Sequence, residues 1–154
     1  MKKVLIQFVL IFIYMSSIEF IAISQNIKNV QNEILVKKKE FFNEKIPLSV
    51  DEQKKFWPIY EDYFKRLNYI SQQRNSLLDF FTSNEKNLSS DEINDIYKKL
   101  MKLQEDEYNL TKEYFEKFKQ ILPEGKVIKL FIVENEFKKW LLSQALTIRQ
   151  NKRN

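Results

Sequence analysis

The scarcity of helix-breaking residues constrains this chain more than any other feature. Its 154 residues include one glycine and three prolines. In a helix interior, glycine costs about 1 kcal/mol and proline about 3 kcal/mol relative to alanine. These two residues therefore tend to mark where helices end. A chain with so few of them is expected to adopt an all-α fold of long helices joined by short corners.

Two helix starts are encoded in capping boxes. Ser49 precedes an apolar-periodic segment and is followed three positions later by Glu52. The same arrangement recurs with Ser89 and Glu92. In such a box the serine hydroxyl accepts from the backbone N–H of the glutamate, and the carboxylate accepts from the serine N–H. We therefore expect long helices to begin directly after Ser49 and Ser89.

Each of these segments carries an apolar stripe spaced by threes and fours, which is typical of one helical face. The first stripe has one polar place, Arg74, and consists of Phe56, Tyr60, Tyr63, Leu67, Ile70, Leu77 and Phe81. The second consists of Ile93, Ile96, Leu100, Leu103, Leu110, Tyr114, Phe118 and Ile121. The first stripe keeps its phase across Pro58, which predicts a bend and not an end. The polar residues 84–87 predict a loop, so the two segments form a long antiparallel hairpin.

Two further helices complete the predicted fold. A short N-terminal helix over about 27–43 ends before Ile46-Pro47, because a residue preceding proline is pushed out of the helical region. Pro123 is placed as the first residue of a C-terminal helix, which presents Val127, Leu130, Phe131, Phe137, Leu141, Ala145 and Ile148. The basic tail 149–154 is expected to fray. The four helices form either a closed bundle or an open cradle.

The N-terminus has the three parts of a secretory signal. Met1-Lys2-Lys3 is basic, residues 4–15 are strongly apolar, and Ala22-Ile23-Ser24 supplies small residues before a cut. The sequence thus predicts a cleaved signal peptide over 1–24 and a single helical domain over 25–154 in the periplasm.

An uncleaved anchor in the inner membrane is the alternative, because apolar residues continue to Ile23. Glu19 interrupts that run, and a membrane span needs about 20 predominantly apolar residues. We therefore favour cleavage.

The residue types that are missing exclude several kinds of site. The chain has no cysteine and no histidine, so it lacks the parts of common nucleophile–base pairs and of most zinc and copper sites. Its one glycine, Gly125, cannot form a glycine-rich phosphate loop. We expect no catalytic residues, no cofactor and no metal. The net charge of +5 suits acidic protein segments or anionic lipid surfaces, and an exported chain would rarely meet nucleic acid.

Several short segments resemble the Spy/CpxP-like family of periplasmic chaperones and envelope stress-response proteins, in its Bacteroidetes-type branch. The Leu-Thr-x-x-Gln element of that family is similar to Leu48-Ser49-Val50-Asp51-Glu52 and to Leu88-Ser89-Ser90-Asp91-Glu92. Both copies have serine for threonine and glutamate for glutamine, and helix capping alone also explains them. Three further pieces fit in order: Phe56-Trp57-Pro58-Ile59-Tyr60, Leu122-Pro123-Glu124-Gly125-Lys126-Val127, and Glu134-Asn135-Glu136-Phe137 leading to Leu141-Leu142.

The resemblance implies a helical homodimer that holds partly unfolded client proteins without ATP. The alternative it implies is a regulatory protein that binds a membrane stress sensor or an anti-sigma partner. It also assigns a helix-corner motif to Leu48, Ser49, Glu52, Leu88, Ser89 and Glu92. Metal binding in the family uses histidines and is not carried over, because this chain has none.

Residues off the stripes are the candidates for contact with clients. The aromatic candidates are Trp57, Phe64, Phe115, Phe131 and Trp140. Lys126 and Lys129 would add positive charge beside them. For each of the rings, burial in the fold or in a dimer seam is as compatible with the sequence as exposure.

Overall fold

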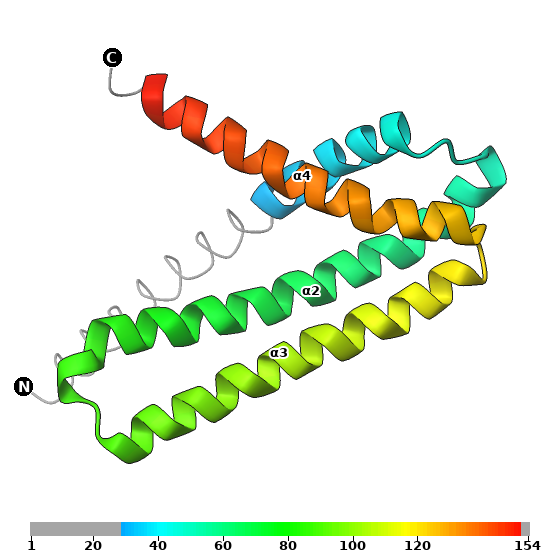
Figure 1. The fold of residues 1–154 in the computed structure, drawn as a ribbon. Coiled ribbons are helices and arrows are strands. Elements are labelled where there is room, and N and C mark those ends of the chain that lie inside the picture. The colour runs from blue at the N-terminus through cyan, green and yellow to red at the C-terminus, as the bar shows by residue number, and fades with distance from the viewer. Residues whose placement is uncertain (1–28, 152–154) are drawn as a thin grey trace, which may run out of the picture. The chain divides into compact units, whose positions relative to one another are not determined.

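The computed structural model describes residues 29–151, and this part of the chain is helical almost throughout, with no strand (Figure 1). The predicted all-α fold is confirmed. The predicted signal peptide over 1–24 and the final residues 152–154 lie outside the described part. The chain divides after Lys45 into two compact units, which are described separately. The single domain predicted over 25–154 includes parts of both and remains a prediction.

The first unit contributes one described helix, over residues 29–45. It ends directly before Ile46-Pro47, as predicted from the backbone restriction that proline places on the preceding residue. Two lysines lie near rings of the same helix. The Lys38 ammonium is 5.8 Å from the centre of the Phe42 ring, and that of Lys45 is 5.7 Å from the centre of Phe41. Both distances are within the range of cation–π attraction.

The second unit contains three long helices and one short one. Helix α2 spans Val50–Asn84, the 3-10 helix η1 spans Glu85–Asn87, α3 spans Ser90–Lys119 and α4 spans Glu124–Asn151. Helices α2 and α3 lie antiparallel and side by side, which confirms the predicted hairpin (Figure 1). The polar segment predicted as a loop over 84–87 is mostly η1. Helix α2 continues through Pro58, so the proline does not end it.

Both predicted capping boxes are formed. The Ser49 N–H donates to Glu52 Oε2 at 2.6 Å, and the Glu52 N–H donates to Ser49 Oγ at 3.2 Å. The corresponding distances in the second box, between Ser89 and Glu92, are 2.8 and 3.3 Å. Each box satisfies backbone donors that a helix start leaves without an intrahelical partner. The helix starts were therefore predicted to the residue.

The start of α4 differs from the prediction. Helix α4 begins at Glu124, and Pro123 precedes it instead of being its first residue. The Pro123 carbonyl accepts from the N–H groups of Lys126 at 2.9 Å and Val127 at 3.2 Å, so proline serves as the cap, where its missing N–H costs nothing. At its other end α4 is described to Asn151, and fraying of the tail 149–154 remains a prediction.

Burial divides the hairpin into two halves. We define the aromatic half as residues 50–67 of α2 with 110–119 of α3, and the tip half as residues 68–84 of α2 with 90–109 of α3. The buried side chains of the aromatic half are Phe56, Tyr60, Tyr63, Phe64, Leu110, Tyr114, Phe115 and Phe118. In the tip half only Ile96 is buried. The two halves have the same kind of apolar stripe but bury it to different extents.

Candidate functional site

Phe118 is the centre of the packing in the aromatic half. Its ring is fully buried and lies 5.2 Å from that of Phe56 and 6.1 Å from that of Tyr60, between ring centres. The rings of Tyr63 and Phe115 are 6.2 and 5.5 Å away. Aromatic pairs in this range add to the free energy of burial. These rings form a core and present no free surface.

Helix α4 is attached to the aromatic half by two polar contacts and one ring stack. The Lys126 ammonium donates to Glu52 Oε2 at 2.6 Å, and the Tyr60 hydroxyl donates to Glu134. The rings of Phe115 and Phe131 stack with their centres 3.8 Å apart. Glu52 thus joins its own capping box to α4. The hydrogen bond from Lys126 lowers the pKa of Glu52, with a further contribution from the Ser49 N–H.

A polar network borders the aromatic half on one side of the hairpin. The Tyr114 hydroxyl donates to Asp62 and accepts from Arg66 at 3.1 Å. The Lys117 ammonium is 2.7 Å from Glu113 Oε1 and 4.1 Å from the centre of the Tyr114 ring. The hydrogen bond from Lys117 lowers the pKa of Glu113 and raises that of Lys117. Because these groups satisfy one another, the network fixes how α2 and α3 align.

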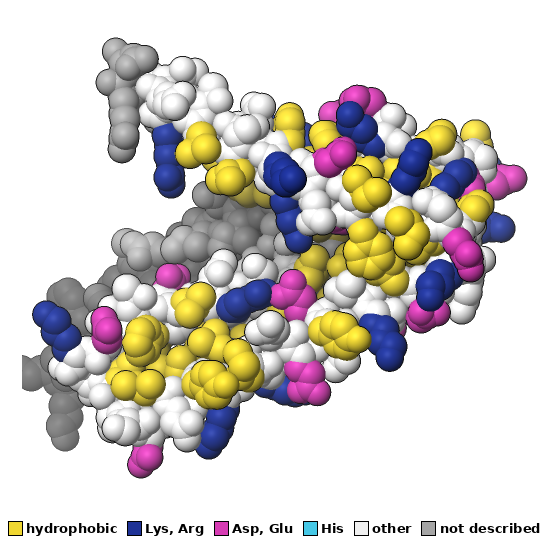
Figure 2. Space-filling view, viewed as in Figure 1, with side chains coloured by type: hydrophobic (Ala, Val, Ile, Leu, Met, Phe, Trp, Pro, Cys, Tyr) yellow, Lys and Arg dark blue, Asp and Glu magenta, His cyan; other side chains and the backbone are white. Residues whose placement is uncertain are grey.

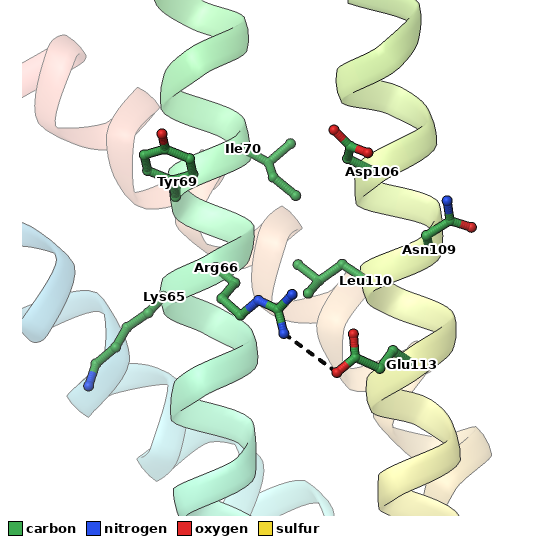
Figure 3. Close-up of a pocket in the computed structure, with 8 residues that line it drawn as sticks. All are labelled: Lys65, Arg66, Tyr69, Ile70, Asp106, Asn109, Leu110 and Glu113. Atoms are coloured by element: carbon green, nitrogen blue, oxygen red, sulfur yellow. Dashed lines mark hydrogen bonds and ion pairs between the residues drawn. The ribbon is translucent and has the colours of Figure 1, made fainter.

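A shallow groove of about 490 Å³ lies beside this network (Figure 3). Figure 3 shows Arg66 directed toward Glu113, at 3.5 Å, while Ile70 and Leu110 point toward each other between the helices. The groove is lined by Lys65, Arg66, Tyr69, Ile70, Asp106, Asn109, Leu110 and Glu113. Its two basic and two acidic side chains give it no net charge.

The tip half exposes large apolar side chains on both helices. Seven are exposed there: Tyr69, Leu78, Phe80, Ile93, Tyr97, Met101 and Tyr108. Figure 2 shows apolar side chains gathered over both helices near the turn that joins α2 to α3. A second groove of about 390 Å³ lies here, lined by Gln73, Ser76, Leu77, Phe80, Lys99, Lys102 and Leu103. This half is the candidate contact surface of the hairpin.

The five aromatic candidates from the sequence have different environments. Phe64 and Phe115 are buried, so neither contributes surface. Trp57 and Trp140 are partly buried, and each lies against a buried ring, with ring centres 5.0 Å from Phe56 and 5.6 Å from Phe137 respectively. Phe131 is exposed over 47% of its surface while stacking on Phe115. Among the five, Phe131 has the most accessible ring.

The other predicted site residues act mainly in the fold. Lys126 is ion-paired with Glu52, whereas Lys129 is exposed. Ser49, Glu52, Ser89 and Glu92 form the two caps, and the Leu48 side chain is buried beside the first of them. Leu88, at the corresponding place, is only partly buried. In this structure the helix-corner motif is a capping device.

The sequence analysis missed the exposed residues of the tip half. Several of them directly follow or precede a stripe residue: Leu78 beside Leu77, Phe80 beside Phe81, Tyr97 beside Ile96 and Met101 beside Leu100. Neighbouring residues on a helix point about 100° apart, so one of each pair must leave the stripe. Adjacent apolar residues in a segment that packs against only one other helix were therefore the sequence pattern that indicates this exposed surface.

The clustering and the pKa of the carboxylates in the described residues bear on metal binding and acid–base chemistry. Within residues 29–151, no three carboxylates lie close enough together to hold a metal ion. Backbone and side-chain hydrogen bonds from Ser89 lower the pKa of Glu92, as bonds from Lys126 and Lys117 do for Glu52 and Glu113. A lowered pKa keeps a carboxylate ionised and makes it a poor general acid near neutral pH.

Of the helices in the described part, none has both the length and the apolar character needed to cross a bilayer. In comparisons with known proteins, no family model, no curated protein and no solved structure matches this chain.

Proposed function

We propose that this chain is an ATP-independent holdase-type chaperone that binds partly unfolded proteins in the bacterial envelope. The observation that carries the proposal is the tip half, where two long helices together expose seven large apolar side chains. Apolar surface of this kind binds apolar segments of other polypeptides without requiring a defined partner sequence. A holdase binds clients of different sequence, so its contact surface cannot depend on one defined partner sequence.

The charges in the tip half are only partly paired. On α3, Lys102 is 3.2 Å from Glu105 and 3.0 Å from Asp106, and Lys98 is 3.7 Å from Asp95. The tip half carries seven acidic and four basic side chains, so it keeps a net negative charge. Exposed ion pairs contribute little binding energy, and the proposal therefore rests on the apolar surface.

The sequence adds two kinds of support. The basic, apolar and small-residue parts of the N-terminus favour export, and the segments similar to the Spy/CpxP-like family favour a chaperone or a stress-response protein. Export is tested by measuring the mass of the chain recovered from the envelope of an expressing bacterium. A mass corresponding to a start near Gln25 is expected. A chain that keeps residues 1–24 would contradict the cleaved signal and favour the anchor.

An aggregation assay tests the chaperone activity. The exported chain should suppress aggregation of several unrelated denatured proteins at near-stoichiometric ratio and without ATP. The double substitution Phe80→Ser with Tyr97→Ser removes two exposed rings from the tip half, and we expect it to require about tenfold more chain for the same protection. Helical content should stay unchanged, because neither ring is buried.

A matched variant shows whether the tip half is the site. Leu142→Ser with Leu146→Ser removes exposed apolar surface of similar size from α4 and should leave protection intact. Equal losses of protection in the two variants would mean that the tip half is not the specific client-binding surface. If the chain protects none of the clients, the chaperone proposal fails and a regulatory role with one protein ligand becomes the better hypothesis.

The proposal includes a homodimer, and the same variants test it. Sedimentation equilibrium should give twice the mass of one chain. If Phe80→Ser with Tyr97→Ser produces a monomer, these rings belong to the dimer seam and not to the client surface. A dimer that survives the substitution, with protection lost, supports direct contact between these rings and the client.

A further inference from the structure

The outward face of α4 carries an unusual combination of residues. One side of the helix is buried through Val127, Leu130, Val133 and Phe137. With about 100° between successive residues, a second set of apolar side chains lies on the opposite side. These are Ile128, Phe131, Ile132, Leu142 and Leu146, and between 47% and 62% of each is exposed. Helix α4 is therefore apolar on two sides.

Three of the five basic residues of α4 lie on the same outward side. Together with the exposed apolar residues, Lys138, Lys139 and Arg149 occupy an arc of about 120°. Lys138 and Lys139 are exposed and form no ion pair with a described residue. Glu134 points inward to Tyr60, and Glu136 lies at the border of the arc. Between Ile128 and Arg149, the arc thus contains basic groups and no carboxylate.

The second half of α4 is accessible around its circumference. From Leu142 to Asn151 every side chain that can be described is exposed. The outward face is the convex side of a single helix, whereas a protein partner would need a groove shaped to receive it. A fluid bilayer adapts to a convex surface without such a groove. Basic side chains beside apolar ones are also what an interfacial helix needs at a negatively charged bilayer.

We propose that the outward face of α4 docks on the surface of a bilayer that contains anionic phospholipids, with the helix lying in the interfacial plane. Ile128, Phe131, Ile132, Leu142 and Leu146 enter the boundary between headgroups and acyl chains. Lys138, Lys139 and Arg149 bind lipid phosphates. The inference goes beyond the proposed chaperone function and does not rest on it, because the client surface lies on the hairpin.

Vesicle flotation tests the charge requirement. The exported chain is mixed with vesicles of phosphatidylcholine alone or of an equimolar mixture with phosphatidylglycerol, and binding is expected only to the mixture. Each basic residue near such a surface contributes about 1 kcal/mol, so Lys138→Glu with Lys139→Glu should weaken binding by roughly 30-fold or more. The matched variant Lys54→Glu with Lys55→Glu changes net charge equally on α2, and its binding should fall by less than about threefold.

A fluorescent probe tests which part of the chain touches the lipid. The chain has no cysteine, so a single introduced one can be labelled with an environment-sensitive dye. Anionic vesicles should shift the emission of a dye at Leu146→Cys to the blue and leave a dye at Gln72→Cys, on exposed α2, unchanged. This readout also separates α4 from any contribution of residues 1–24.

Three results would overturn the proposal. They are equal binding to neutral and anionic vesicles, equal dye shifts at the two positions, and no vesicle binding at all. If vesicle binding is absent but the α4 lysine variant loses affinity for an acidic polypeptide such as polyglutamate, the face belongs to a protein partner. Each of these results leaves the aggregation assay, and with it the proposed function, unaffected.

Discussion

The two halves of the α2–α3 hairpin have similar stripes and different surroundings. In the aromatic half, Phe56, Tyr60, Tyr63, Tyr114 and Phe118 of the stripes are all buried. In the tip half, Leu77, Phe81, Leu100 and Leu103 are only partly buried, and Ile93 is exposed. A stripe thus defines which side of a helix faces its neighbour. It does not define how completely that neighbour covers it.

The difference follows from the number of helices that meet. Two helices alone cover only a narrow strip of each other, so apolar residues at the edges of the strip stay in water. In the aromatic half, α4 adds a third surface through Lys126, Glu134 and Phe131. No such contact with α4 occurs in the tip half. Stability therefore concentrates at one end of the hairpin, and accessible apolar surface at the other.

The largest difference between the two halves should appear when a central ring of the aromatic half is removed. Phe118→Ala leaves a cavity among five aromatic neighbours, and we expect a loss of about 3–5 kcal/mol in the free energy of unfolding. Phe80→Ala in the tip half should cost less than about 1 kcal/mol, because half of that side chain is already exposed. Urea unfolding followed by circular dichroism measures both changes.

A milder substitution keeps that test informative if Phe118→Ala does not fold. Phe118→Leu retains much of the buried apolar volume and should cost about 1–2 kcal/mol. Similar losses for the Phe118 and Phe80 variants would show that the two halves are equally packed, contrary to the burial in the structure.

The sequence predicted the fold well because its signals are local. Ser49 with Glu52 and Ser89 with Glu92 encode the helix starts within four residues, and the residue before Pro47 encodes a helix end. The stripes identify the facing sides of α2 and α3. Pro123 was placed one residue too far into α4, because the first helical position and the cap both tolerate a missing N–H.

The candidate site was predicted less well because exposure depends on contacts between distant segments. Phe115 and Phe131 were both identified as off-stripe rings, and they stack on each other, with Phe115 buried and Phe131 half exposed. No spacing rule distinguishes them. Conversely, Phe80 and Tyr97 resemble ordinary neighbours of stripe residues, and both are exposed because each points away from the side of its helix that faces the other helix.

Substitution of the two capping serines should have effects of intermediate size that again differ between the two halves. Ser49→Ala and Ser89→Ala each remove a hydrogen bond to a backbone N–H and should cost about 1 kcal/mol of helix stability. At Ser49 we expect this loss in global unfolding, since α2 begins in the packed half. At Ser89 we expect it as faster amide hydrogen exchange in the first turns of α3, because the tip half can open locally. Ser90→Ala, next to the cap, is the control and should change neither measurement.

The smallest expected effect concerns the pH dependence of the two capping carboxylates. Both Glu52 and Glu92 have a pKa below the ordinary value of 4.5 in the folded chain. A group whose pKa is lowered on folding stabilises the fold above its unfolded pKa, and this stabilisation is lost as the pH falls through the folded pKa. Wild type should therefore exceed Glu92→Gln in stability at pH 7, and the difference should shrink below about pH 4.5. Glu52→Gln should show a larger difference with the same sign, because it also removes the charge that pairs with Lys126 of α4. Equal pH profiles for the two variants would mean that the bond to Lys126 adds nothing, and that α4 is held on the aromatic half by the hydrogen bond between Tyr60 and Glu134 and by its apolar contacts.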